Sequence, residues 1–225
     1  MSDLRRRVLL VEGRDDQHIL KNLFVQHKIP CYIPVGDESD EYDQEKVLIL
    51  AREGVDAVLE DFAVRVKESD LVGLGVIVDA DTDLGSRWTA WRDVLIRNGY
   101  SDAHVPAVPD PNGTVVEQRD KATVGIWIMP DNTVAGMLED FAAFLIPDSD
   151  ILWRRAKACV DQIPLAERGF AAVHLSKAYI HTWLAWQAIP GTPLGQAITR
   201  KYFDTKASSA QDLMNWAHRL FTVAP

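Results

Sequence analysis

The chain has 225 residues, with 47% hydrophobic and 25% charged side chains, which is the composition of an ordinary globular protein. Its formal net charge is -9, and no apolar run reaches the roughly 20 residues that a membrane-spanning helix needs. Because the basic residues 1–7 lead into a strand pattern and not into a signal sequence, we expect a cytoplasmic protein with no membrane partner.

Strand and helix patterns alternate over residues 1–147, which predicts an α/β domain with a mainly parallel, Rossmann-like sheet flanked by helices. The predicted strands are residues 7–11, 32–35, 74–78, 115–117 and 124–129. The predicted helices are residues 15–27, 44–67 with a break near Gly54, 87–98 with Ser86 as N-cap, and 134–145 with Thr133 as N-cap. The acidic residues 36–43 are predicted to form a loop.

Strand patterns stop after Pro147, and residues 148–225 are predicted to form an all-helical C-terminal subdomain that packs on the first domain. Its predicted helices are residues 151–162, 170–187, 194–203 and 210–221. We expect Trp183, Trp186 and Trp216 to fill the core of these helices and not to stack on nucleic-acid bases.

Charge is distributed unevenly along the chain. Residues 1–150 carry 15 Lys and Arg against 29 Asp and Glu, a net of -14, whereas residues 151–225 carry 9 against 4, a net of +5. An acidic half beside a basic half suits a polyphosphate or nucleic-acid partner, because phosphate contacts supply much of that affinity. A basic helical surface without such a ligand explains the distribution equally well.

Two acidic clusters follow predicted strands. Glu12 comes directly after strand 7–11, and Asp79 and Asp81 follow strand 74–78. Parallel strands bring their carboxyl ends to one edge of the sheet, which is where ligands of open α/β sheets bind. Carboxylates gathered at that edge repel one another unless they share a cation. The pattern therefore predicts a site for a hard divalent metal ion.

The turn after the first strand supports this prediction. Gly13 permits a tight turn that leaves Glu12 at the sheet edge and puts Asp16 in the first turn of the following helix. Asp16 has an alternative role, because an acid in the first turn also complements the helix dipole. For Asp16 the two explanations stay open at this point.

The second cluster has the same two kinds of explanation. A strand that continued through Asp79 and Asp81 would point both carboxylates the same way, which is the beginning of a Mg²⁺ site. Alternatively, these acids are loop residues that cap the helix near Ser86. The capping explanation fits Asp83 better than Asp79.

The chain resembles the TOPRIM (topoisomerase–primase) superfamily over about residues 5–147. Residues 12–13 match the glutamate–glycine that follows the first strand in that superfamily, and residues 79–81 match its later D-x-D motif. Within the superfamily, the chain is most similar to OLD-type nucleases and to uncharacterised bacterial relatives. Their E-G-x-x-D and G-x-L-E motifs correspond to residues 12–16 and 136–139, and Lys177 corresponds to a downstream lysine of some members.

The resemblance implies Mg²⁺-dependent phosphodiester chemistry, with Mn²⁺ as a substitute, on a TOPRIM fold. Two metal ions would clamp the attacking and leaving oxygens of an in-line displacement. The implied ligands are carboxylates from three regions of the chain. They are Glu12, Asp79 and Asp81 for the first ion, and Asp16, Asp83 and Glu139 for the second.

The same resemblance assigns further roles. Instead of binding metal, Glu12 could alternatively serve as general base or acid if burial raises its pKa, and Lys177, Arg154 or Arg155 would stabilise developing charge. The tyrosine-bearing domain of topoisomerases is not present in these 225 residues, so hydrolysis is the simplest expectation, and we predict a nuclease-like enzyme.

The predicted partners follow from the basic half of the chain and from related nucleases. DNA or RNA would contact the basic C-terminal helices. The chain carries no G-x-x-x-x-G-K-[ST] motif, so any ATP dependence would come from a partner ATPase. Two alternatives stay open, namely an effector or interaction subunit of a larger defence-type complex, and a degenerate TOPRIM scaffold that binds metal weakly.

Overall fold

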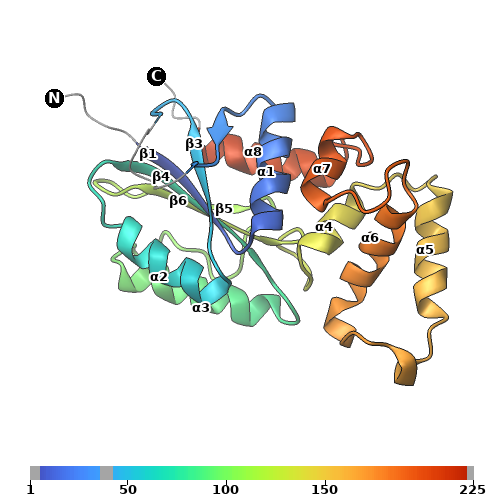
Figure 1. Cartoon of the computed structure of the whole chain (residues 1–225). Coiled ribbons are helices and arrows are strands. Elements are labelled where there is room, and N and C mark those ends of the chain that lie inside the picture. Colours follow the sequence, from blue (N-terminus) through green and yellow to red (C-terminus); the bar gives the residue numbers. More distant parts are fainter. Residues whose placement is uncertain (1–5, 36–42, 222–225) are drawn as a thin grey trace.

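The computed structural model describes residues 6–35 and 43–221, so residues 36–42 of the predicted acidic loop lie outside the described part. A six-stranded sheet with the order β2-β3-β1-β4-β6-β5 forms the centre (Figure 1). The strands are β1 (Arg6–Val11), β2 (Cys31–Tyr32), β3 (Val47–Ala51), β4 (Leu71–Asp79), β5 (Thr114–Val116) and β6 (Thr123–Met129). Neighbouring strands are parallel except for β5 and β6. The predicted α/β class with a mainly parallel sheet is confirmed.

Helices cover both faces of this sheet (Figure 1). The helices are α1 (Arg14–Gln26), α2 (Val55–Arg65), α3 (Leu84–Arg97), α4 (Leu138–Phe144), α5 (Ile151–Asp161), α6 (Leu175–Ala185), α7 (Leu194–Thr199) and α8 (Ser208–Phe221). α2 and α3 pack on one face, α1 and α8 pack on the other, and α7 packs on α1. α5 and α6 form an arm that extends beyond α4. No helix in the described ranges is long and apolar enough to cross a membrane.

The central strands are apolar on both faces because helices cover the sheet on both sides. Leu9 and Val11 of β1 lie in the core shared with α1 and α8, whereas Val8 and Leu10 lie in the core shared with α2 and α3. All four side chains are fully buried. Burial on both faces holds β1 and β4 in place and thereby positions the residues that follow them.

The helical pattern predicted over residues 44–67, with a break near Gly54, is wrong in its first part. Val47–Ala51 is strand β3, which pairs with β1 on one side and with β2 on the other. A short, continuously apolar run has no periodicity that separates a buried strand from a buried helix, so the pairing partners decide. Gly54, with a φ of 91°, then leads into α2.

Two further boundaries near the sheet differ from the prediction. The second strand is limited to Cys31–Tyr32 and does not extend over residues 32–35. α3 begins three residues earlier than predicted, because Asp83 and not Ser86 is its N-cap. The Asp83 carboxylate accepts a hydrogen bond from the backbone N–H of Ser86, which satisfies one of the free donors at the helix start.

The predicted starts of α4 and α6 are also too early. Gly136 has a φ of 148° and Met137 is extended, so the chain enters α4 only at Leu138, and Thr133 does not cap it. α6 begins at Leu175, after a short 3₁₀ turn. In both places the backbone conformation before the helix, and not the apolar pattern, determines where the helix begins.

The tryptophans of the C-terminal helices are mostly in the core. Trp183 and Trp216 are fully buried, as predicted, but Trp186 is 40% exposed because α6 ends at Ala185, and that prediction is wrong. Trp216 brings α8 against the sheet, where its indole N–H donates to the carbonyl oxygen of Thr114 in β5 at 3.1 Å. The last helix of the chain therefore belongs to the same core as the first strands.

Gly113 makes the close approach of α8 possible, and its replacement by alanine is expected to destabilise the protein strongly. Its φ is +84°, and an added β-carbon would lie 2.4 Å from Cδ1 of Trp216 and 2.8 Å from Cε3 of Trp127. Strain and overpacking together should cost about 2–4 kcal/mol, measured as the free energy of unfolding in urea. Gly191→Ala is the matched control, because Gly191 has a φ of +76° and open space around it. If both variants lost the same free energy of unfolding, close packing around Gly113 would not be the cause.

Candidate functional site

The carboxyl ends of β1 and β4 bring Glu12 and Asp79 together. The two strands are neighbours, with Val11 paired to Ile77, so the residue after β1 lies beside the end of β4. Oε1 of Glu12 accepts a hydrogen bond from the backbone N–H of Asp79 at 2.8 Å. These residues are 67 positions apart in the chain, and the predicted meeting of the two acidic segments is confirmed for this pair.

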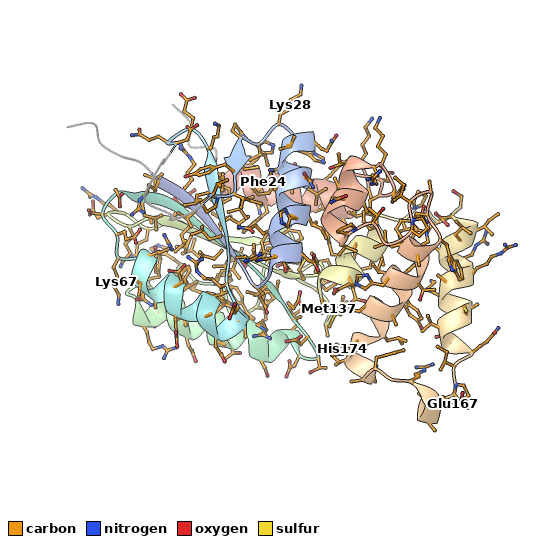
Figure 2. The ribbon with its side chains drawn as sticks, viewed as in Figure 1. Phe24, Lys28, Lys67, Met137, Glu167 and His174 are labelled. Carbon is orange, nitrogen blue, oxygen red and sulfur yellow. The ribbon has the colours of Figure 1, made fainter. Side chains whose placement is uncertain are left out.

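The start of α4 adds a third acid to this edge. Oδ1 of Asp79 accepts a hydrogen bond from the backbone N–H of Leu138, the first residue of α4, at 2.9 Å. Glu139 follows at once and is only 6% exposed. Figure 2 labels Met137, which immediately precedes this helix. The helix start therefore delivers both a backbone donor and a buried carboxylate to the sheet edge.

Asp16 completes a group of four acids, which we call the carboxylate cluster: Glu12, Asp16, Asp79 and Glu139. The extended conformation of Gly13 leads directly into α1 and places Asp16 in its first turn, where only 9% of the residue is exposed. A β-carbon on Gly13 would lie 3.2 Å from Oδ2 of Asp16, so the turn is tightly packed against this carboxylate.

Burial raises the pKa of every member of the cluster, and repulsion between members raises it further for Asp79 and Asp16. Burial is the largest cause for Asp79, followed by the charges of Asp16, Glu12 and Glu139, and together they raise its pKa to about 8. Burial and then the charges of Glu12 and Glu139 raise the pKa of Asp16 to about 7. Burial also raises the pKa values of Glu12 and Glu139. The ionised form of the cluster is therefore disfavoured in the absence of a cation.

Cationic side chains lie at the rim of the cluster. Nζ of Lys177 on α6 is 3.7 Å from Oε1 of Glu139, and the charges of Lys177 and His181 oppose the rise in the pKa of Glu139. Lys177 and His181 are four residues apart and so share one face of α6. Sequence reasoning had singled out Lys177 but missed His181, although this spacing was the signal that would have found it.

Asp81 does not join the cluster in the predicted way. β4 ends at Asp79, and Asp81 has a φ of +54°, so no strand continues through the two residues and their side chains do not point the same way. The Asp81 carboxylate is exposed and forms a 2.6 Å ion pair with Arg87 of α3. Its charge still raises the pKa of Glu12, and that of Arg87 lowers it. Arg87, which the sequence analysis did not single out, therefore belongs to the rim.

Asp83 is engaged elsewhere. Its carboxylate accepts hydrogen bonds from the backbone N–H of Ser86 at 3.0 Å and from the hydroxyl of Ser86 at 2.6 Å, and these bonds lower its pKa. The capping role that the sequence left open is the role seen in the structure. The first turn of α3 holds the Asp83 carboxylate, and its predicted role as a metal ligand stays a prediction.

A single family model covers the sheet, its helices and the carboxylate cluster. A family model described as "Protein of unknown function (DUF3226)" matches residues 6–222. The chain belongs to the DUF3226 family. The matched residues include all six strands, the carboxylate cluster and the C-terminal helix α8, so the DUF3226 unit is the sheet together with its helices. No curated protein and no solved structure matches the chain.

The cluster of this DUF3226 member suits a hard cation by donor type. Four carboxylates supply the oxygen ligands that Mg²⁺ and Mn²⁺ prefer, and their uncompensated charge would be relieved by a bound cation. In the ranges that the structure describes, no three or more His, Cys, Asp or Glu side chains are arranged so as to hold a metal ion. Metal binding would therefore require side chains of the cluster to turn toward a common point.

Proposed function

We propose that the protein is a metal-dependent phosphodiester hydrolase of the nuclease type, with the carboxylate cluster as its Mg²⁺ site. The observation that carries the proposal is the gathering of four acids with raised pKa values at the carboxyl edge of a parallel sheet. Such a group is costly to keep in a metal-free protein, and perturbed acids in this position are typical of functional sites. The resemblance to TOPRIM nucleases supports the same chemistry.

The residues of the chain would divide the work as follows. Glu12 and Asp79 would hold the ion with Asp16 and Glu139, and a bound Mg²⁺ supplies Lewis-acid stabilisation of a phosphoryl oxygen. In the alternative assignment Glu12 does not bind the ion but serves as general base or acid, a role suited to a carboxyl whose pKa is raised by burial. Lys177 at the rim would stabilise negative charge on the phosphate.

Nucleic acid is the proposed substrate because a basic arm extends beyond the cluster. α5 and α6 project away from the sheet beyond α4 (Figure 1), and Arg154 and Arg155 on α5 are exposed. The acidic residues at the sheet edge and the basic residues on the arm would bind metal and phosphate backbone, respectively.

A cleavage assay tests this function. Purified protein with Mg²⁺ or Mn²⁺ should cut single- or double-stranded DNA or RNA, EDTA should stop the reaction, and Glu12→Ala should abolish it with an unchanged circular dichroism spectrum. Glu60→Ala is the matched control, because Glu60 is an exposed glutamate on α2. If the wild-type protein cuts no nucleic acid and no nucleotide with either metal, the solitary enzyme is ruled out.

A second function is favoured by the far end of the arm. Leu165 is 80% exposed there, and Ile163 and Val173 also expose apolar side chains. Exposed apolar surface is typical of regions that bind other proteins, so we propose a partner-held subunit, with an ATPase as the partner, as the alternative. Isolation of the native complex and measurement of its mass would distinguish the two functions. Absence of both metal binding and a partner would leave a degenerate scaffold.

A further inference from the structure

A cavity lies near the loop that carries Glu12. It has a volume of about 430 Å³ and is formed between the N-terminal half of α1 and the carboxyl end of β3. Two backbone hydrogen bonds join its β3 side to the loop that carries Glu12: Arg52 N–H donates to Val11 at 2.8 Å, and Gly54 N–H donates to Glu12 at 3.2 Å. The cavity and the cluster are therefore built on the same short loop.

The α1 wall of the cavity is cationic. Arg14 and His18 line it, both are exposed, and their spacing of four residues puts them on the same face of the helix. The helix begins at Arg14 and has no side-chain cap, so its first backbone N–H groups add positive character to this wall. Arg52 also lines the cavity, but its guanidinium is held by Asp61 at 2.8 Å and serves the structure of the wall.

The opposite side of the cavity is apolar, with one buried amide. Ile33 and Pro34 contribute the apolar surface. Gln17, which is only 8% exposed, lies between them and the cationic wall, and its Nε2 donates to the carbonyl oxygen of Ile49 at 2.7 Å. This bond fixes the orientation of the amide.

We infer that this cavity binds one nucleotide of the substrate strand, with its phosphate against Arg14 and His18 and its base against the apolar side. The cationic end suits the phosphate of a nucleotide, and the apolar side suits the face of its base. The fixed amide suits the hydrogen-bonding edge of the base. Its volume lies within the roughly 300–1,000 Å³ of small-ligand pockets. The inference rests on the proposed function, because it makes the bound nucleotide a neighbour of the phosphodiester held at the cluster.

Nucleotide binding in EDTA tests this inference apart from catalysis. Calorimetric titration of the full chain with AMP and TMP should show binding, whereas adenosine and thymidine should bind at least about tenfold more weakly because they lack the charged phosphate. The double variant Arg14→Ala/His18→Ala should lose at least about tenfold in affinity for the monophosphates. Alanine at position 18 keeps the β-carbon that packs against Gly195, so the fold should be retained.

The matched control is Lys67→Ala/His104→Ala, which removes one exposed cation and one exposed histidine outside the cavity. Figure 2 shows Lys67 at the end of α2, away from α1. The inference is overturned if no monophosphate binds at millimolar concentration, if nucleosides bind as tightly, or if the double variant binds like the control. Mn²⁺ titration separates the two proposals: a protein that binds monophosphates but neither Mn²⁺ nor a cleavable strand disproves the nuclease and not the nucleotide cavity.

Discussion

Asp79→Asn is expected to stabilise the metal-free protein and at the same time to slow metal-dependent cleavage strongly. Asparagine keeps an oxygen for the hydrogen bond from Leu138 and removes the charge that Asp16, Glu12 and Glu139 repel. At pH 8 we expect the free energy of unfolding to rise by at least about 1 kcal/mol, which is less than the free energy that corresponds to a change of one in pKa. For a chain of this size this is a rise in Tm of roughly 2–4 °C. The cleavage rate should fall about 100- to 1,000-fold, as when a preorganised electrostatic group is removed.

The pH dependence of the same protein follows from the raised pKa values. Folding raises the pKa of Asp79 from 3.8 to about 8 and that of Asp16 from 3.8 to about 7. The folded state therefore binds more protons than the unfolded state, and the stability present below pH 4 is lost progressively as the pH rises toward 8. In EDTA, the Tm of the wild type should fall between pH 5 and pH 8, and Asp79→Asn should reduce this fall.

Added Mn²⁺ should make the wild type more stable than Asp79→Asn. A cation takes the place of the bound protons, so added Mn²⁺ should raise the Tm of the wild type at pH 8. The free energy of unfolding should rise by about 2.7 kcal/mol when the free Mn²⁺ concentration is a hundred times the dissociation constant. Asp79→Asn should gain little. Glu60→Gln, on the exposed side of α2, is the control for loss of one negative charge. Equal stabilisation of all three proteins by Mn²⁺ would show that the carboxylate cluster is not the metal site.

The second large effect is expected at Trp216. This side chain is fully buried, contacts Trp127 of β6 with ring centroids 5.9 Å apart, and donates a hydrogen bond to Thr114. Replacement by alanine leaves a large cavity between α8 and the sheet and should cost about 3–5 kcal/mol. The fall in Tm should be roughly 6–20 °C.

Hydrogen exchange distinguishes a local from a global effect of Trp216→Ala. Because α8 shares its core with the sheet, amides of β4 and β6 should lose protection together with those of α8. Trp186→Ala is the control, since this side chain is 40% exposed and should contribute less than about 1 kcal/mol. Loss of protection confined to the C-terminal helices would instead support the predicted boundary between residues 1–147 and 148–225.

The order of the strands predicts which acids meet at the site, and local backbone conformation changes the outcome for Asp81. Glu12 and Asp79 meet because acids that follow neighbouring parallel strands must lie at one edge, and this rule needs only the strand pattern. Asp81 departs from the expected direction because its left-handed conformation turns the chain after β4. Sequence spacing of two residues contains no information about that turn. The pairing of Asp81 with Arg87 depends on where α3 begins, which is again decided by a local feature, the cap at Asp83.

The amino-acid sequence by itself determined the fold class, most of the strands and the identity of the acids at the sheet edge, because alternation and apolar runs are local properties of the chain. Tertiary structure alone decided that Val47–Ala51 is a strand, that α8 completes the core of the sheet, and that Asp81 pairs with Arg87. The reason is physical: burial, repulsion between carboxylates and pairing of strands are interactions between distant segments. Their free energies exist only once the segments have been brought together.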